Sequence, residues 1–498
     1  MVRVLSSALF RRAAVLPVKA AAPAWTSADF RWITFTLFPI LLVAFLLPVH
    51  PNDYWWYVRL GGDIAQIGAI PQVDTLSSTQ TGEPFVVHAW LAALVFWALH
   101  GLGGAAATVL GTGTAIAAFY LITWVTCREA GSGPQLASAF TLLAALSGSS
   151  NWVVRPQLFV YPLFGLVLFT LWRWQNGSNH GLWVLPATSL FWVKLHGSFV
   201  LPFLLCGAAL AAGSGNRRGL GMAMGGTFAA TLVNPRGLGA WAYALDLLGN
   251  PAVRQFSREW HPPSNTGWQA AIFFSWLLLF PLLAARSSRK PVALHWLWFL
   301  GLGWMALSSV RNQIWFLAVL APLSAALLSA WLRERVTAKA YRVRPAVNVL
   351  VGVTLLLLLA AGLPGIRERW WPTPPPALSL ATPVAAAGWL GAHPELKGSV
   401  WTEPGFASYL VYALPDRKVW IDTRFELYPV EQWERYVEIS EAAPGWERQL
   451  EEEQVELVMV NSKDQPRLLA ALEGSPDWCE RYRDAAAAVF AKDCPLAP

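Results

Sequence analysis

The chain contains few charged residues for its length of 498 residues. Asp, Glu, Lys and Arg together make up 13% of it, whereas hydrophobic residues make up 55%. A soluble globular protein carries roughly 25% charged residues. This composition excludes an ordinary cytosolic enzyme, a disordered chain and a nucleic-acid-binding protein built on basic patches. We therefore expect membrane lipids, and no nucleic acid, among its partners.

Cysteine is also scarce, since only four are present, too few for a disulfide framework. Cys127 and Cys206 lie in or beside apolar runs, a position typical of packing within a membrane. Cys479 and Cys494 flank an apparent hairpin near the C-terminus. If that part of the chain lies outside the cytoplasm, the two could form a disulfide.

The net charge of +7 hides two opposite contributions. Residues 1–363 contain 24 Lys and Arg against 9 Asp and Glu, a charge of +15. Residues 364–498 contain 13 against 21, a charge of −8. The two parts of the chain therefore face different environments.

Long apolar runs account for most of the first part. A helix needs about 17–25 apolar residues to cross a bilayer, and in lipid such segments must be helical because no backbone group can be left unpaired. About eleven segments qualify, namely 33–49, 103–126, 135–151, 157–172, 182–195, 198–213, 218–233, 267–285, 294–310, 313–332 and 346–363. The sequence predicts a polytopic α-helical membrane protein.

The segment 85–100 is ambiguous, because it could be an interfacial helix or a twelfth span. We favour the interfacial helix because eleven spans give 17 basic residues on the N-terminal side and seven on the other side before the C-terminal part. This is the bias of the positive-inside rule. It predicts an inner-membrane protein whose N-terminus is cytoplasmic and whose C-terminal part is extracytoplasmic, on the periplasmic side.

These observations divide the chain into three parts. Residues 1–32 form a basic cytoplasmic arm, residues 33–363 form the transmembrane domain with a first external loop at 50–102, and residues 364–498 form a small α/β domain. Short apolar runs at 418–422, 455–460 and 485–490 predict strands in that domain. Charged helical patterns at 431–441 and 446–454 lie between them.

The first external loop carries the clearest chemical signal. Asp53 follows the first span by a few residues, where an acid at the membrane interface is often functional. The neighbouring Trp55 and Trp56 would anchor the loop at headgroup depth. The alternative is that Asp53 only caps the following helix, a common structural role of Asp.

Several motifs in this loop and beyond resemble those of the GT-C glycosyltransferases, the superfamily of the oligosaccharyltransferases and the polyprenyl-phosphate-sugar-dependent transferases. The run D-x-W-W-x-x-R-L-G, with Arg59, precedes G-x-I-P-x-x-D-T-x-S-x-T and a W-L pair. Motifs similar to a bacterial branch follow at Leu195-His196-Gly197, Asn234-Pro235-Arg236-Gly237, Glu259-Trp260-His261-Pro262, Arg311-Asn312 and Val419-Trp420-Ile421-Asp422-Thr423-Arg424. The resemblance covers most of residues 33–490 and implies a GT-C-like fold.

The resemblance also implies a site. Asp53 matches the first-loop acid, which acts as a general base or a metal ligand, so a divalent metal ion is left open. Cations at external span ends would bind the phosphate of a polyprenyl-phosphate sugar donor, and these are Arg311, Arg155, Lys194 and His196. The second acid common in GT-C enzymes is replaced by Asn52, and Glu259 or Asp74 are the candidates to supply it.

Two functions follow from the resemblance. The first is transfer of a sugar from a polyprenyl-phosphate donor to an extracytoplasmic lipid, glycan or protein, with Asp53 as base. The alternative is a non-catalytic GT-C-like membrane subunit or lipid-binding partner within a larger complex, which the missing second acid favours. Protein partners in the membrane are compatible with both.

Overall fold

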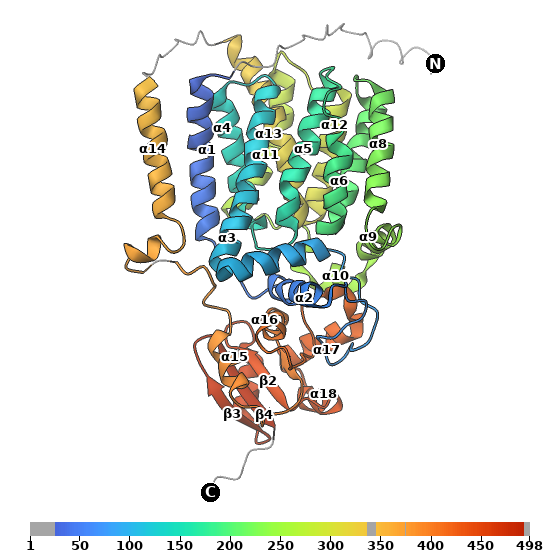
Figure 1. Cartoon of the computed structure of the whole chain (residues 1–498), viewed down its shortest axis with the longest axis vertical. Coiled ribbons are helices and arrows are strands. Elements are labelled where there is room, and N and C mark those ends of the chain that lie inside the picture. The colour runs from blue at the N-terminus through green and yellow to red at the C-terminus, as the bar shows by residue number, and fades with distance from the viewer. Residues whose placement is uncertain (1–24, 336–344, 374, 493–498) are drawn as a thin grey trace.

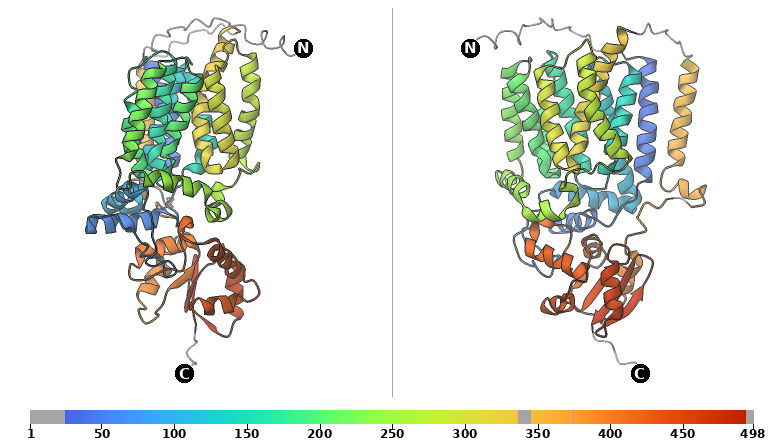
Figure 2. Two further views of the ribbon diagram at one scale, coloured as in Figure 1. Left: turned by 90° about the vertical axis from the view of Figure 1, so that its right-hand side faces the viewer. Right: turned by 180° about the vertical axis from the view of Figure 1, so that it is seen from behind.

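A computed structural model of the chain describes residues 25–335, 345–373 and 375–492. Long helices run side by side at one end, and a smaller sheet with its helices lies at the other end (Figure 1). The same two-part arrangement is visible from the side and from behind (Figure 2). Short helices and loops fill the level between the two parts.

Each apolar segment predicted from the sequence overlaps a helix of the bundle. Within the described residues these helices are α1 (Ser27–Leu46), α3 (Trp90–Glu129), α4 (Pro134–Gly148), α5 (Gln157–Gln175), α6 (Val184–Leu195), α7 (Leu201–Ala212), α8 (Arg217–Leu232), α11 (Trp268–Arg286), α12 (Ala293–Ser308), α13 (Gln313–Arg333) and α14 (Pro345–Ala361). Five of the described helices are long and apolar enough to cross a membrane, and four shorter ones are apolar. The protein is thus membrane-spanning, whereas the count of eleven spans stays a prediction.

Helix α3 consists of two helical parts that meet at a kink. Gly103 and Gly104 have non-helical backbone angles, and Gly104 has φ +60° and ψ −145°. The part before the kink lies across the end of the bundle beside α2 (Tyr54–Ile67), while the part after it runs parallel to the other long helices (Figure 1). This is the placement that an interfacial helix at 85–100 requires.

The two ends of the bundle hold different sets of charges. At the end remote from the sheet, Arg128 forms an ion pair with Asp29 at 2.7 Å. Arg289 and Arg333 donate to the carbonyls of Ala130 and Gly131 at 2.5 and 2.7 Å. Basic residues that the charge rule assigns to the cytoplasm therefore gather at the end opposite the sheet (Figure 1).

The C-terminal part contains a four-stranded sheet in the order β1-β2-β4-β3. Its strands are β1 (Val400–Thr402), β2 (Leu457–Asn461), β3 (Trp478–Arg483) and β4 (Ala487–Lys492). β1 pairs parallel to β2, the other neighbours pair antiparallel, and Val458 lies opposite Phe490. β2 and β4 match the predicted runs at 455–460 and 485–490. The run at 418–422 forms isolated bridges instead, through Val419.

Five helices surround this sheet, and two others connect it to the bundle. The first group is α15 (Val384–Gly391), α16 (Pro404–Ala413), α17 (Val430–Ser440), α18 (Trp446–Glu452) and α19 (Pro466–Gly474). The second group is α9 (Gly239–Gly249) and α10 (Pro251–Phe256). The ring of Phe256 stacks on Trp433 at a centroid distance of 5.8 Å, so α10 packs directly against α17. The expected pairing of Cys479 with Cys494 involves a residue outside the described ranges.

Hydrogen bonds to backbone carbonyls of the C-terminal part hold the loop between α2 and α3 against it. The Ser78 amide donates to the Val419 carbonyl at 2.8 Å, and the Thr79 hydroxyl donates to the Trp420 carbonyl at 2.9 Å. The segment 418–422 is therefore held between β1 and this loop rather than within the sheet. These hydrogen bonds place the residues that follow the segment 418–422 at the end of the helical bundle.

Candidate functional site

A cavity of about 180 Å³ lies where the bundle, α9, α10 and the C-terminal part meet. Its walls carry charged and aromatic side chains from loops that are far apart in the sequence, among them Asp53, Trp56, Tyr57, His88, Arg155, His196, Tyr243, Glu259, Trp260, Arg311, Arg424 and Glu426. Asp53, Arg155, His196, Glu259 and Arg311 were all predicted as site residues from the sequence. The structure brings these five together.

Asp53 immediately precedes α2 but does not cap it. Its side chain accepts no hydrogen bond from the helix, whereas the Asn52 side chain accepts from the Tyr54 amide at 3.1 Å. The Asp53 carboxylate instead lies 3.6 Å from Nε of Arg155 and lines the cavity. The side-chain hydrogen bond at the start of α2 therefore involves Asn52 rather than Asp53. The Asp53 carboxylate is available to a molecule in the cavity.

A chain of charges runs across the cavity wall. Arg155 precedes α5, Glu259 lies in the 3-10 helix η3 (Arg258–Trp260), and Arg311 lies in η4 (Val310–Asn312). One carboxylate oxygen of Glu259 forms a close ion pair with Arg155, and the other lies 3.0 Å from Nη1 of Arg311. The Glu259 carboxylate thus bridges the two arginines. Asp53 extends the chain at the Arg155 end.

Arg311 is held by neutral groups as well. Its guanidinium lies over the ring of Trp260, 4.9 Å from the centroid, and Nη2 lies 3.2 Å from Nε2 of His196. Burial and the neighbouring Arg311 hold the pKa of His196 well below its usual range, so the ring is neutral. These contacts orient the planar fork of Arg311 toward the cavity. Lys194, in the last turn of α6, is not among the described residues that line it.

The first-loop motif residues attach α2 to the C-terminal part. Trp55 packs edge-to-face on Tyr409, with ring centroids 4.8 Å apart, and Nε1 of Trp56 donates to the Thr423 hydroxyl at 3.1 Å. Arg59 pairs with Asp63 one turn along the helix, at 3.1 Å. Of these motif residues, Trp56 also lines the cavity.

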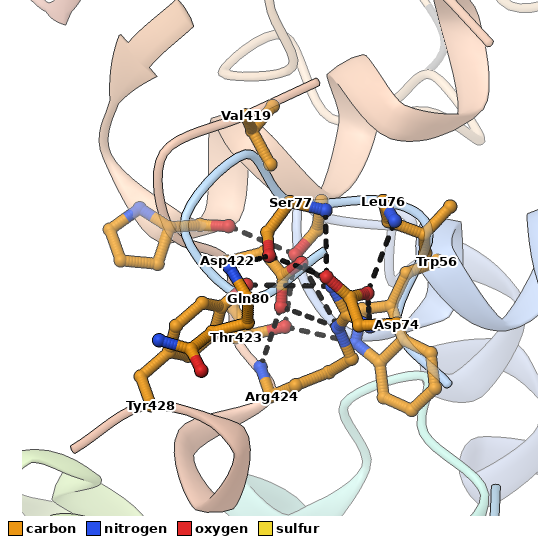
Figure 3. A network of polar contacts seen from close by, with 12 residues as sticks. Trp56, Asp74, Leu76, Ser77, Gln80, Val419, Asp422, Thr423, Arg424 and Tyr428 are labelled. Atoms are coloured by element: carbon orange, nitrogen blue, oxygen red, sulfur yellow. Dashed lines mark hydrogen bonds and ion pairs between the residues drawn. The ribbon is translucent and has the colours of Figure 1, made fainter. Parts of the chain in front are cut away.

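Asp74, the other candidate for a second acid, does not line the cavity and belongs to a buried network around Arg424 (Figure 3). Nη1 of Arg424 lies 2.5 Å from Asp74, and Nη2 lies 2.6 Å from Asp422. All three side chains are at most 1% exposed. Burial by itself would raise the pKa of Asp74, but Arg424 and the Ser77 hydroxyl outweigh it and hold this pKa below its usual value. Asp74 is thus an ionised partner of Arg424.

Three further residues of the cavity, Glu426, Tyr243 and His88, were not predicted as site residues from the sequence. Glu426 lies in η6 (Phe425–Leu427) of the C-terminal part, and one of its oxygens accepts a hydrogen bond from the Tyr243 hydroxyl at 2.8 Å. The Tyr243 ring stacks on His88 at a centroid distance of 4.6 Å. Glu426 and Tyr243 are 183 residues apart, and no motif marks either of them.

The residues around Asp53 do not fit a metal held by the protein. The charged neighbour of Asp53 is a guanidinium, and Glu259 is engaged by two arginines. Among the described residues, no three His, Cys, Asp or Glu side chains gather where they could hold a metal ion. What the cavity offers is a carboxylate beside two arginines, a combination suited to proton abstraction next to a phosphate.

Comparisons with known proteins find similar folds among solved structures. No family model matches the sequence, and no curated protein matches it. Among solved structures, a mycobacterial arabinofuranosyltransferase, AftD, is similar over 95% of this chain, with a TM-score of 0.56 and 14% identity. This chain spans 40% of the length of AftD.

Two further solved structures have the same fold. The oligosaccharyltransferase of Archaeoglobus fulgidus, with a tethered acceptor peptide, is similar over 93% of this chain and 74% of its own, with a TM-score of 0.58 and 11% identity. ArnT from Cupriavidus metallidurans is similar over 92% and 97%, with a TM-score of 0.50 and 13% identity. The chain therefore has the GT-C fold, as the resemblance of its motifs implied.

Proposed function

We propose that the protein is a membrane glycosyltransferase that transfers a sugar from a polyprenyl-phosphate donor to an acceptor outside the cytoplasm. The observation that carries the proposal is the uncapped carboxylate of Asp53 in one cavity with Arg155 and Arg311. The GT-C fold supports it, because the similar solved structures include an oligosaccharyltransferase and an arabinofuranosyltransferase.

In this proposal Asp53 is the general base. The oxygen of an acceptor hydroxyl attacks the anomeric carbon of the donor sugar, and its proton passes to the Asp53 carboxylate. The bond between that carbon and the phosphate oxygen breaks, and the electron pair leaves with the phosphate. A base must lie within hydrogen-bond reach of the hydroxyl, and Asp53 lines the cavity in which the hydroxyl would lie.

Arg155 and Arg311 would bind the donor phosphate. A guanidinium offers two parallel N–H donors that fit two phosphate oxygens. The Glu259 carboxylate already contacts both arginines, so a phosphate would share them with Glu259 or displace it. His196 would hold the Arg311 side chain in place through its contact with Nη2. Lys194 would contribute only through its longer-range charge.

The membrane context of the proposal follows from the arrangement of the two ends of the bundle. Residues of α2, α9 and the C-terminal part line the cavity. These elements lie at the end of the bundle opposite the C-terminal ends of α3 and α13, which carry Arg128 and Arg333 (Figure 1). The charge rule would make the end with these two arginines cytoplasmic. The donor would then enter from the outer leaflet of the inner membrane, and the acceptor would come from the periplasmic side.

Replacement of Asp53 by Asn tests the proposal. Membranes containing the wild type or D53N are incubated with labelled polyprenyl-phosphate sugars and extracts of lipid and glycan acceptors. We expect D53N to reduce transfer about 10²–10⁴-fold, the usual contribution of a general base. Asp63→Asn, on the same helix but outside the cavity wall, is the matched control. Equal transfer by folded wild type and D53N would refute the role of Asp53 as base, and absence of transfer by both would favour the non-catalytic alternative.

A further inference from the structure

The C-terminal part contributes its own carboxyl group to the cavity. Glu426 lines the same cavity as Asp53, and its side-chain hydrogen bond comes from the Tyr243 hydroxyl at 2.8 Å. In the described part of the chain, the ion pairs of the cavity engage Asp53 and Glu259 but not Glu426. Among the described residues no cation forms an ion pair with Glu426, so its carboxyl group can form further hydrogen bonds.

The surroundings of Glu426 raise the pKa of its carboxyl group above the ordinary value. Burial raises the pKa of Glu426, and the charge of Asp53 adds to this, while the Tyr243 hydroxyl and Arg424 oppose it. A carboxyl group accepts hydrogen bonds when it is ionised and also donates one when it is protonated, so it can pair with a hydroxyl in either state. A site of this kind suits an uncharged partner.

Tyr243 connects this carboxyl group to a second, smaller cavity. Tyr243 and the stacked His88 line both spaces, and the second holds about 60 Å³. Burial and the charge of Arg311 lower the pKa of His88 to about 4, so this ring is neutral near pH 7. Asn234, Arg236 and Trp90 also line the small cavity.

This combination of groups fits a carbohydrate. Sugar rings present apolar faces that pack on aromatic rings, and hydroxyls that pair with carboxyl, amide and guanidinium groups. The cationic form of an amine acceptor would be repelled by Arg155 and Arg311. The apolar chain of a lipid would leave Glu426 and the Tyr243 hydroxyl without new partners.

We propose that Glu426 and Tyr243 bind hydroxyl groups of a carbohydrate acceptor and so present its reacting hydroxyl to Asp53. The acceptor extends past His88 into the smaller cavity. Glu426 is a positioning residue in this scheme, because it touches the acceptor away from the reacting atoms. The inference rests on the proposed glycosyltransferase function and specifies the acceptor class of the same site.

Binding of simple sugars to the whole chain tests the inference without catalysis. The protein is held in lipid nanodiscs free of glycoside detergents and titrated with methyl glycosides of common hexoses and pentoses. Tryptophan fluorescence reports binding, since Trp56 and Trp260 line the cavity. We expect at least one glycoside to bind the wild type, and E426A and Y243F each to raise its Kd about tenfold, which corresponds to about 1.4 kcal/mol.

A conservative variant separates hydrogen bonding from charge. E426Q keeps a neutral donor and acceptor, so we expect it to restore the Kd to within threefold of the wild type. Glu431→Ala, an exposed position on α17, is the control for effects on the C-terminal part and should bind like the wild type. Failure of every glycoside to bind, or equal binding by E426A and the wild type, would overturn the inference.

The transfer assay with D53N keeps the two proposals distinguishable. Loss of glycoside binding in E426A alongside unchanged transfer in D53N would contradict Asp53 as base but support the acceptor site. Loss of transfer in D53N alongside unchanged glycoside binding in E426A would support the function and refute the acceptor site.

Discussion

At the level of single residues, the charged groups of the cavity are distinguished by their partners rather than by their types. Asp53 faces one guanidinium at 3.6 Å, Glu259 bridges two, and Glu426 accepts from a phenol. Asp74 is fully buried against Arg424. Four carboxyl groups near one end of the bundle thus differ in the hydrogen bonds and ion pairs that they can still form, because each has different partners.

Arg311 offers a test of phosphate binding by geometry rather than by charge. Arg311→Lys keeps the charge but loses the planar fork, the contact with Trp260 and the match to two phosphate oxygens. We expect kcat/KM for the polyprenyl-phosphate donor to fall about tenfold, since one good charge-assisted hydrogen bond is worth about 1.5–3 kcal/mol. Arg218→Lys, an exposed residue of α8, is the control. Unchanged donor kinetics in R311K would refute the assignment.

Asp74 provides a stability prediction. In D74N, the buried guanidinium of Arg424 loses one of its two carboxylates, and breaking a buried pair costs about 3–5 kcal/mol. We expect a lower thermal unfolding temperature of D74N in nanodiscs, while Glu83→Gln, an exposed change in the same loop, stays within about 0.5 kcal/mol. Equal unfolding temperatures would contradict the network.

The same carboxyl group predicts a pH dependence. The pKa of Asp74 is lower in the folded protein than its ordinary value, so its contribution to stability is fully present above about pH 4. The contribution is lost as the pH falls through the lower folded value. The unfolding temperature of the wild type should therefore drop more steeply than that of D74N below pH 4. Parallel pH profiles would contradict this.

At the level of elements, the kink in α3 separates a helical part that lies across the end of the bundle from a part that runs along the bundle (Figure 1). The angles of Gly104, φ +60° and ψ −145°, lie in a region open essentially to Gly. A residue with a Cβ would straighten the helix or strain the backbone. The kink therefore decides whether the part of α3 before Gly103 lies across the end of the bundle beside α2.

Replacement of Gly104 by Ala tests this directly. We expect G104A to be destabilised by about 1–3 kcal/mol, since the strain of this conformation has no compensating contact. Gly101→Ala is the matched control, because Gly101 is helical with nothing within 4 Å of an added Cβ, and Ala there should stabilise the helix by up to about 1 kcal/mol. Thermal unfolding in nanodiscs measures both. A G104A variant as stable as G101A would show that the kink is not required.

At the level of the whole molecule, the C-terminal part closes the cavity rather than standing apart from it. It is attached through the hydrogen bonds of the Ser78 amide and the Thr79 hydroxyl, the Asp74–Arg424 pair and the Phe256–Trp433 stack. Thr423, Arg424 and Glu426 follow this attachment directly and line the cavity. The site is thus complete only when both parts of the chain are in place.

The orientation in the membrane can be measured by cysteine labelling. Ser214 and Glu431 are exposed, and the elements that carry them lie at opposite ends of the helical bundle, before α8 and on α17 (Figure 1). In intact cells we expect a membrane-impermeant maleimide to label E431C, and S214C only after permeabilisation, because the basic end should be cytoplasmic. Labelling of S214C in intact cells would reverse the topology.

Much of the helical bundle was predictable from the sequence. Lipid forces each apolar segment to satisfy its own backbone hydrogen bonds, so a local run of residues suffices to predict a helix. The predicted segments accordingly overlap helices throughout the described bundle. The short strands were harder, because β1 has three residues and the run at 418–422 pairs mainly with segments distant in sequence. Its partners depend on tertiary structure.

The site divides in the same way. Five site residues could be predicted because they follow the ends of apolar segments that the charge rule assigns to one side, namely Asp53, Arg155, His196, Glu259 and Arg311. Spans of alternating direction bring such ends together. The pairing of each carboxylate with its cation depends on the tertiary structure. The fold paired Asp74 with Arg424, 350 residues away, and placed Glu426 against Tyr243, because electrostatic partners depend on distances of a few ångströms that no local pattern encodes.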